Sequence, residues 1–219
     1  MNYPFVAASH FYKGGNRPRW IVIHDLEYPN TPGAARWAAN YFATNVPKSA
    51  HYTVDPNEII QSVREEDGAW HTPGYIQGVE VNRQSIGVEH GGYARDPWND
   101  ANASATLERS AVLVAEIAQR HGIPVQWLSP SEIRSGTPGI AGHDDFTIAT
   151  GSGTHVDPGR NFPRDWYITR VRDAQGAGGS RLRSALIIAG LVGAAIWLAT
   201  RPVTLPNDAR GAGPEGEPA

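Results

Sequence analysis

The stretch Trp20-Ile21-Val22-Ile23-His24 decides the expected fold, because it is short, apolar and rich in β-branched residues and ends on a polar side chain. Such a run predicts a buried strand. The following segment, Gly33 to Thr44, carries apolar residues at helical spacing. A second apolar run, Ser85 to His90, contains Ser85-Ile86-Gly87-Val88-Glu89 and predicts another strand, with a carboxylate near its end. Trp20 to His24 and the helical segment that follows it therefore form a first unit of a strand and a helix.

Further patterns extend this reading along the chain. His51 to Val54 and Glu58 to Val63 predict a hairpin around the turn residues Asp55-Pro56-Asn57. Ala105 to His121 has the apolar spacing of a helix, and Gly122 ends it. The sequence thus alternates strand and helix patterns.

Two segments complete the expected domain. Ser129 to Thr154 is rich in Gly, Ser and Thr and is predicted to be largely loop. Pro163 to Asp173 is predicted to close the domain as a helix. The sum is an α/β fold with a central mixed β-sheet flanked by helices, in one domain covering residues 1–172.

Composition excludes several classes of function. The 219 residues include 19 basic and 22 acidic side chains, and the net charge of -3 provides no basic surface for nucleic acid. The chain has no cysteine, so disulfides and thiolate zinc sites are excluded. Any bound metal must be held by histidine and carboxylate side chains.

The carboxyl-terminal part has a different character. Residues 184–200 carry no charge and lie between Arg183 and Arg201, which predicts a transmembrane helix at the lower limit of length; a buried core helix is the alternative. Residues 173–183 are predicted to be a flexible linker and residues 201–219 a disordered tail. More arginines precede the helix than follow it, which predicts that the amino-terminal domain lies in the cytoplasm. Met1 to Arg19 shows no secretory signal, and small residues in the helix would allow oligomerisation.

Four polar residues suggest chemistry only when they are taken together. Alone, His24 is best read as a core histidine, His143 as a surface residue, and Asp157 before Pro158-Gly159 as a turn residue. Together, two histidines and a carboxylate leave the fourth position of a tetrahedral zinc open for water. Glu89 could then serve as a separate base.

Six short motifs occur in a familiar order over about residues 18–170. They are Ile23-His24, Ser49-Ala50-His51-Tyr52, Ala69-Trp70-His71, Asn82 with Ser85-Ile86-Gly87-Val88-Glu89, Gly142-His143, and Asp157-Pro158-Gly159 with Phe162-Pro163. With these motifs the chain resembles the type 2 N-acetylmuramoyl-L-alanine amidases, which include phage lysins and are related to peptidoglycan recognition proteins. The resemblance implies the amidase fold and zinc as the cofactor.

The resemblance also implies a role for each matching residue. His24, His143 and Asp157 match the zinc ligands. Glu89 matches the glutamate that activates the attacking water, and His51 matches a structural histidine beside the sheet.

Three more matches concern the substrate, and one position departs from the pattern. Trp70 and His71 match a segment that lines the substrate groove, and Asn82 matches a residue near it. His155 stands where family members often have a lysine that stabilises the oxyanion. A histidine can donate to an oxyanion, so His155 is a candidate catalytic residue; its alternative role is to compete with Asp157 as a metal ligand.

The implied function is zinc-dependent cleavage of peptidoglycan between N-acetylmuramic acid and the L-alanine of the stem peptide. A protein without a signal peptide but with a membrane helix suits a phage or prophage endolysin, held at the host's cytoplasmic membrane before it acts on the cell wall. The alternatives are a non-catalytic peptidoglycan-binding module and a protein that acts chiefly by disrupting membranes through its carboxyl-terminal helix. Another divalent metal remains an alternative to zinc.

Overall fold

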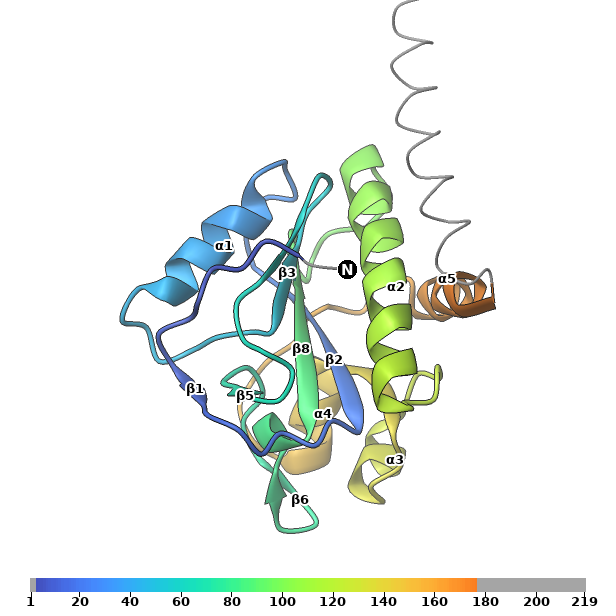
Figure 1. The fold of residues 1–219 in the computed structure, drawn as a ribbon. Helices are drawn as coiled ribbons and strands as arrows, with labels where there is room; N and C mark the ends of the chain where they lie inside the picture. Colours follow the sequence, from blue (N-terminus) through green and yellow to red (C-terminus); the bar gives the residue numbers. More distant parts are fainter. Residues whose placement is uncertain (1–2, 177–219) are drawn as a thin grey trace, which may run out of the picture. The chain divides into compact units, whose positions relative to one another are not determined.

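The computed structural model describes residues 3–176. A five-stranded sheet forms its centre, in the order β4-β3-β8-β2-β9 (Figure 1). The strand β2 (Trp20–Asp25) runs parallel to both β8 (Ser85–His90) and β9 (Gly139–Gly142). The strand β3 (Tyr52–Val54) is parallel to β8, and β4 (Ile59–Gln61) is antiparallel to β3. The predicted α/β fold with a mixed central sheet is confirmed.

Shorter elements and helices surround this sheet. β1 (Phe11–Tyr12) pairs with β5 (Gly68–Ala69), β6 (Tyr75–Ile76) pairs with β7 (Val79–Glu80), and the 3-10 turn η1 (Val81–Arg83) precedes β8. The helices are α1 (Ala34–Ala43), α2 (Ala101–His121), α3 (Pro130–Arg134), α4 (His143–Thr150) and α5 (Arg164–Gly176). Figure 1 shows α1 and α2 on opposite sides of the sheet.

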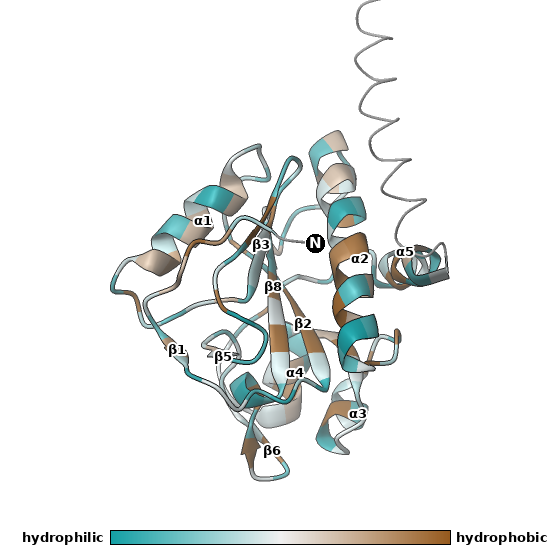
Figure 2. Cartoon of the chain, viewed as in Figure 1, coloured by the Kyte–Doolittle hydropathy of each residue, from teal (hydrophilic) through white to brown (hydrophobic). Residues whose placement is uncertain are grey.

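The two faces of the sheet differ in character, because successive side chains of a strand point to opposite faces. His90 identifies one face, since its Nε2 lies 2.6 Å from Ser110 Oγ of α2 and its ring packs against Tyr167 of α5. We call this the packed face; in β2 and β8 it consists of Ile21, Ile23, Asp25, Ile86, Val88 and His90. The opposite face, called the site face, consists of Trp20, Val22, His24, Ser85, Gly87 and Glu89. Apolar residues run along both strands in Figure 2.

The long helix α2 is defined by its caps and by its apolar side. Asp100 accepts a hydrogen bond from the Ala103 amide at 2.7 Å, so the helix begins at Ala101, earlier than the predicted Ala105. Gly122 ends it in the left-handed conformation, with φ of 64°. Leu113 and Ile117 are fully buried. Local capping and burial therefore agree in making this segment helical.

The prediction that Ser129 to Thr154 is largely loop is wrong. The segment contains α3, β9 and α4. Ser129 and Glu132 form a capping box at the start of α3, and the Asp145 carboxylate accepts the Gly142 amide at the start of α4. Ile133 of α3 and Phe146 of α4 are fully buried. As a result, His143 is the first residue of a helix, not a loop residue.

The closing helix is confirmed and is longer than expected. It begins at Arg164 and reaches Gly176, so it includes residues 173–176 of the predicted linker. The rest of that linker, the predicted membrane helix at residues 184–200 and the tail at residues 201–219 lie outside the described residues. Among residues 3–176, no helix has the length and apolar character needed to cross a membrane.

Candidate active site

Three neighbouring parallel strands bring polar side chains to one edge of the sheet. His24 lies near the end of β2, directly opposite Glu89 of β8 in the strand register. Ile23 is paired with Gly142 of β9, so His143 follows at the same level. Carboxyl ends of parallel strands are where α/β proteins place their ligands. The fold thus explains why residues far apart in sequence meet here.

Asp157 reaches this edge from the loop between α4 and α5. The Asp144 amide donates to the Asp157 carbonyl at 2.8 Å, which ties the loop to the first turn of α4. Gly142 allows this approach, because a Cβ there would lie 2.7 Å from Pro158 Cδ. A larger residue at position 142 would push the loop, and Asp157 with it, away from the histidines.

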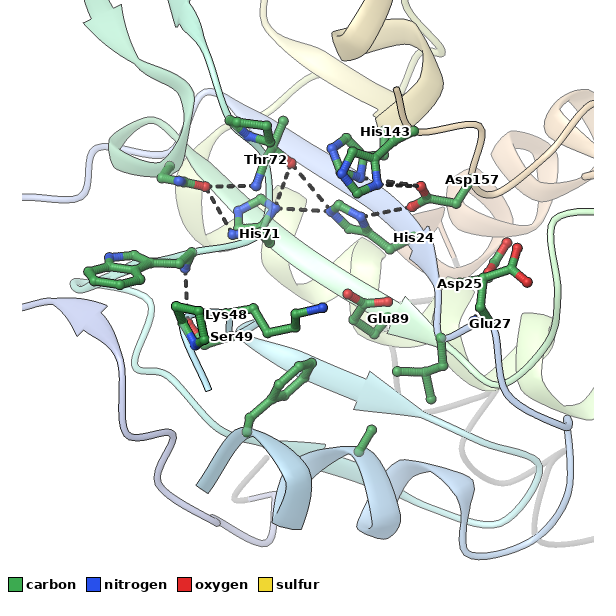
Figure 3. Close-up of a pocket in the computed structure, with 18 of the residues that line it drawn as sticks. His24, Asp25, Glu27, Lys48, Ser49, His71, Thr72, Glu89, His143 and Asp157 are labelled. Atoms are coloured by element: carbon green, nitrogen blue, oxygen red, sulfur yellow. Dashed lines mark hydrogen bonds and ion pairs between the residues drawn. The ribbon is translucent and has the colours of Figure 1, made fainter. Parts of the chain in front are cut away.

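The side chains of His24, His143 and Asp157 converge (Figure 3). His24 Nδ1 lies 3.0 Å from Asp157 Oδ2, and His143 Nδ1 lies 3.3 Å from Asp157 Oδ1. All three residues are buried, and their possible ligand atoms lie within 4.8 Å of one another. Zinc ligands in a tetrahedral site are about 3.4 Å apart, since each sits about 2.1 Å from the metal. The predicted residues are therefore together, in an arrangement that fits a zinc ion.

The electrostatics of these residues suit a metal as well. Burial lowers the pKa of His24 to about 4, so the ring is neutral at pH 7. Burial alone would raise the pKa of Asp157, but hydrogen bonds with His143 and His24 outweigh it and hold this pKa well below its usual range. A neutral imidazole and an ionised carboxylate are the forms that bind metal.

Glu89 lies beside this group with one oxygen free. Its Oε2 is buried and has no hydrogen-bond partner among the described residues. Burial raises the pKa of Glu89 well above its usual value, and the nearby charges of Asp157 and Asp25 add to the effect. The charge of Lys48 acts in the opposite direction, and Figure 3 shows the Lys48 ammonium extending toward the Glu89 carboxylate. A carboxylate with a raised pKa in a cleft is suited to accept and return a proton.

A cavity of about 740 Å³ opens over the site. Aromatic residues form its walls, with Trp37 and Tyr41 on α1 and Trp70 and Tyr75 across from them. Lys48 is the one lysine or arginine among the described residues that line it. The acidic lining residues are Asp25, Glu27, Glu80, Glu89 and Asp157. Burial raises the pKa of two of these carboxyl groups, Asp25 and Glu89, so a substrate entering here would meet fewer negative charges than the lining residues suggest.

The predicted substrate residues all line this cavity, although they differ in surroundings. The ring of Trp70 packs against Tyr12, with centroids 5.3 Å apart. Asn82 Oδ1 accepts the backbone amides of His71 and Thr72, at 3.1 and 2.8 Å. The His71 ring is buried and contacts His24, so it lies at the floor of the cavity and not on an open wall.

His155 and His51 occupy contrasting positions. The ring of His155 stacks on His143 with centroids 3.8 Å apart, and its Nδ1 lies 3.4 Å from Asp157 Oδ1. Its side chain is 51% exposed, whereas the residues that converge as possible metal ligands are all buried. His51 is fully buried, accepts the Gly87 amide at 3.0 Å and contacts the Asp67 carbonyl at 3.0 Å, as a structural histidine would.

Sequence reasoning missed several residues of the cavity. Trp37 and Tyr41 were taken as part of the apolar spacing of a helix, yet both side chains are exposed at the cavity wall. Their spacing of four residues on one helix face was the available signal. Lys48 precedes a motif that was recognised, but nothing in its local sequence indicates the direction of its side chain. Thr72, beside His71, was missed for the same reason.

Fold and site together define the class of the protein: an α/β protein with a cluster of metal-ligand residues and a buried glutamate at the carboxyl edge of a mixed sheet. The family model for N-acetylmuramoyl-L-alanine amidase matches residues 14–160. The chain belongs to this family, as its motifs indicated. A comparison with curated protein sequences gives no match.

Several solved structures share the fold. The Staphylococcus aureus hydrolase AmiA, determined with its ligand, is 19% identical, with 80% of this chain and 85% of that chain covered and a TM-score of 0.59. The catalytic domain of XlyA is 18% identical, with coverage of 78% and 99% and a TM-score of 0.56. The amidase LysC from Clostridium intestinale URNW is 16% identical, with coverage of 78% and 95% and a TM-score of 0.53. At these identities the likeness concerns the fold.

Proposed function

We propose that the protein is a zinc-dependent amidase that hydrolyses the bond between N-acetylmuramic acid and the L-alanine of the peptidoglycan stem peptide. The observation that carries this proposal is the convergence of His24, His143 and Asp157 beside Glu89. Zinc held by these three side chains would acidify water and polarise the scissile carbonyl. Family membership supplies the substrate class.

The residues of the chain then have separate tasks. Glu89 takes the proton of the water that attacks the carbonyl carbon. It returns this proton to the L-alanine nitrogen as the C–N bond breaks, leaving a carboxylate on the lactyl group. His155, exposed above His143, donates a hydrogen bond to the oxyanion. Lys48 supplies positive charge across the cavity from these groups.

The test is digestion of purified peptidoglycan by the full-length protein, with products identified by mass spectrometry. We expect stem peptides with a free L-alanine amino group, no such products after chelation, and recovery when zinc is added back. The variant Glu89→Gln should lose most of this activity. Its matched control is Glu27→Gln, which should keep it, because Glu27 also lines the cavity. Binding to peptidoglycan without any cleavage would instead indicate a non-catalytic binding module.

We further propose that the protein is a phage or prophage endolysin held at the cytoplasmic membrane by residues 184–200. The support is the uncharged run between Arg183 and Arg201, of a length that reaches the lower limit for a membrane helix. Fractionation of expressing cells, followed by an alkaline wash, is the test. Retention in the membrane pellet is expected, and a wholly soluble protein would refute the anchor while leaving the amidase proposal untouched.

A further inference from the structure

A chain of hydrogen bonds runs behind His24, away from Asp157 (Figure 3). His24 Nε2 lies 3.0 Å from His71 Nδ1. His71 Nε2 lies 3.1 Å from Ser85 Oγ, and the Ser85 hydroxyl lies 2.7 Å from the Val81 carbonyl. His24, His71 and Ser85 are all buried. This chain links the proposed metal site to the backbone of η1.

The chemistry of the groups gives the chain one direction. A carbonyl only accepts, so the Ser85 hydroxyl donates to Val81 and its oxygen accepts from His71 Nε2–H. A neutral His71 with its proton on Nε2 has a lone pair on Nδ1, which accepts from His24 Nε2–H. A metal that binds His24 Nδ1 takes the place of the proton shared with Asp157, and His24 then needs its own proton on Nε2, where His71 accepts it. His71 and Ser85, on the side of His24 away from Asp157, therefore favour the His24 tautomer that a metal requires.

The surrounding residues hold this arrangement in place. A Cβ at Gly87 would lie 2.6 Å from His71 Cγ, so only glycine leaves room for the ring. Asn82 fixes the backbone of His71 from the other side. The Thr72 hydroxyl lies 2.8 Å from His71 Nδ1 and 3.5 Å from His24 Nε2, so it lies close to both nitrogens of the hydrogen bond between the two rings. On the site face of β8, Ser85 therefore accepts a hydrogen bond from the His71 ring, Gly87 leaves room for that ring, and Glu89 is the proposed base.

We propose that His71 and Ser85 are positioning residues that fix the tautomer and ring orientation of His24 for metal binding. This assigns His71 a role behind the metal, in contrast to the substrate-groove role suggested by its motif. The proposal rests on the proposed zinc site. Its test is therefore built on metal affinity and ring tautomer, with turnover as a separate measurement.

The first experiment measures zinc affinity by competition with a chromophoric chelator. His71→Phe removes the acceptor for His24 and is expected to weaken zinc binding about 10–100-fold, the usual effect of losing an outer hydrogen-bond partner. His71→Asn is expected to restore most of the affinity, because an amide oxygen can accept at the Nδ1 position. Ser85→Ala should have a smaller effect in the same direction. Ser62→Ala is the matched control, since Ser62 is a buried serine whose hydroxyl has no partner among the described residues.

The second experiment records the ¹⁵N shifts of the His71 ring in the metal-free protein, because the bond to Ser85 determines which nitrogen of that ring is protonated. A proton on Nε2 in wild type, and a mixture of tautomers in Ser85→Ala, are expected. Zinc affinities of His71→Phe and Ser85→Ala equal to wild type, with KM raised in His71→Phe, would overturn the proposal in favour of a substrate contact. A wild-type ring with its proton on Nδ1 would also overturn it. Wild-type protein that binds no zinc would refute the proposed function itself, so the two failures are distinguishable.

Discussion

The packed face and the site face of the sheet are built from alternate residues of the same two strands. On the packed face, Ile86 and Val88 of β8 are fully buried against apolar neighbours. On the site face, the same strand places Ser85, Gly87 and Glu89, and Glu89 keeps a buried oxygen without a partner among the described residues. Burying such a group costs free energy, which apolar packing elsewhere must offset. In β8, therefore, one face stabilises the strand while the other holds the polar residues of the candidate site.

Replacing Glu89, the proposed base, should separate the two faces most strongly. Glu89→Gln is expected to lower kcat about 10²–10⁴-fold, the usual contribution of a positioned acid–base group. Because the pKa of Glu89 is raised on folding from its usual 4.5, ionising it above that pH favours unfolding. Glutamine removes this cost, so the melting temperature of the metal-free protein at pH 7 should equal or exceed that of wild type. Steady-state kinetics and calorimetry check both parts, and a fall of several degrees would show that Glu89 belongs to the packing.

The converse change is made on the packed face. Ile86→Ala is expected to lower the free energy of unfolding by about 2–5 kcal/mol, because it leaves a cavity among buried side chains. Denaturant unfolding measures this loss, and kcat per folded molecule should stay unchanged. The matched control is Ile148→Ala, an isoleucine 63% exposed, which should change stability by about 0.5 kcal/mol or less. A large loss of kcat in folded Ile86→Ala would mean that the two faces are not independent.

A smaller effect concerns the charge that faces Glu89. Lys48 lowers the pKa of Glu89, so Lys48→Met should raise this pKa and move the acidic limb of the kcat/KM profile to higher pH. Lys13→Met is the matched control, because Lys13 is exposed and does not line the cavity. An acidic limb at the wild-type pH in Lys48→Met would show that the two charges do not interact in solution.

The sequence predicted the strands and the converging residues because both depend on local pattern and on short motifs. Trp20 to His24 is a continuous apolar run rich in β-branched residues, and Ser85 to His90 alternates polar or small residues with Ile86 and Val88; the structure confirms both as strands. It did not predict α3 and α4, because the segment that contains them, Ser129 to Thr154, is rich in Gly, Ser and Thr, which is typical of loops. Those helices depend on side-chain caps and on the burial of Ile133 and Phe146. Burial of that kind is set by distant parts of the chain.

The direction of Lys48 also depends on contacts between distant segments. The neighbouring Ser49 hydroxyl donates to the His10 carbonyl at 2.6 Å and accepts the Trp70 amide at 2.9 Å. These bonds fix the loop before β3 and so aim Lys48 into the cavity. The hydrogen bond between His71 and His24 is similar, since the two residues come from different parts of the chain. A motif identified His71, but only the fold assigns its partner.

The central claim is that a metal is held by His24, His143 and Asp157. Anomalous diffraction at the zinc edge, from crystals of the full-length protein grown with zinc, tests it most directly. We expect one strong peak bonded to these three side chains, with a fourth coordination position open toward Glu89 and the cavity. A peak held by His155 in place of Asp157, or no peak between the two histidines, would contradict this account.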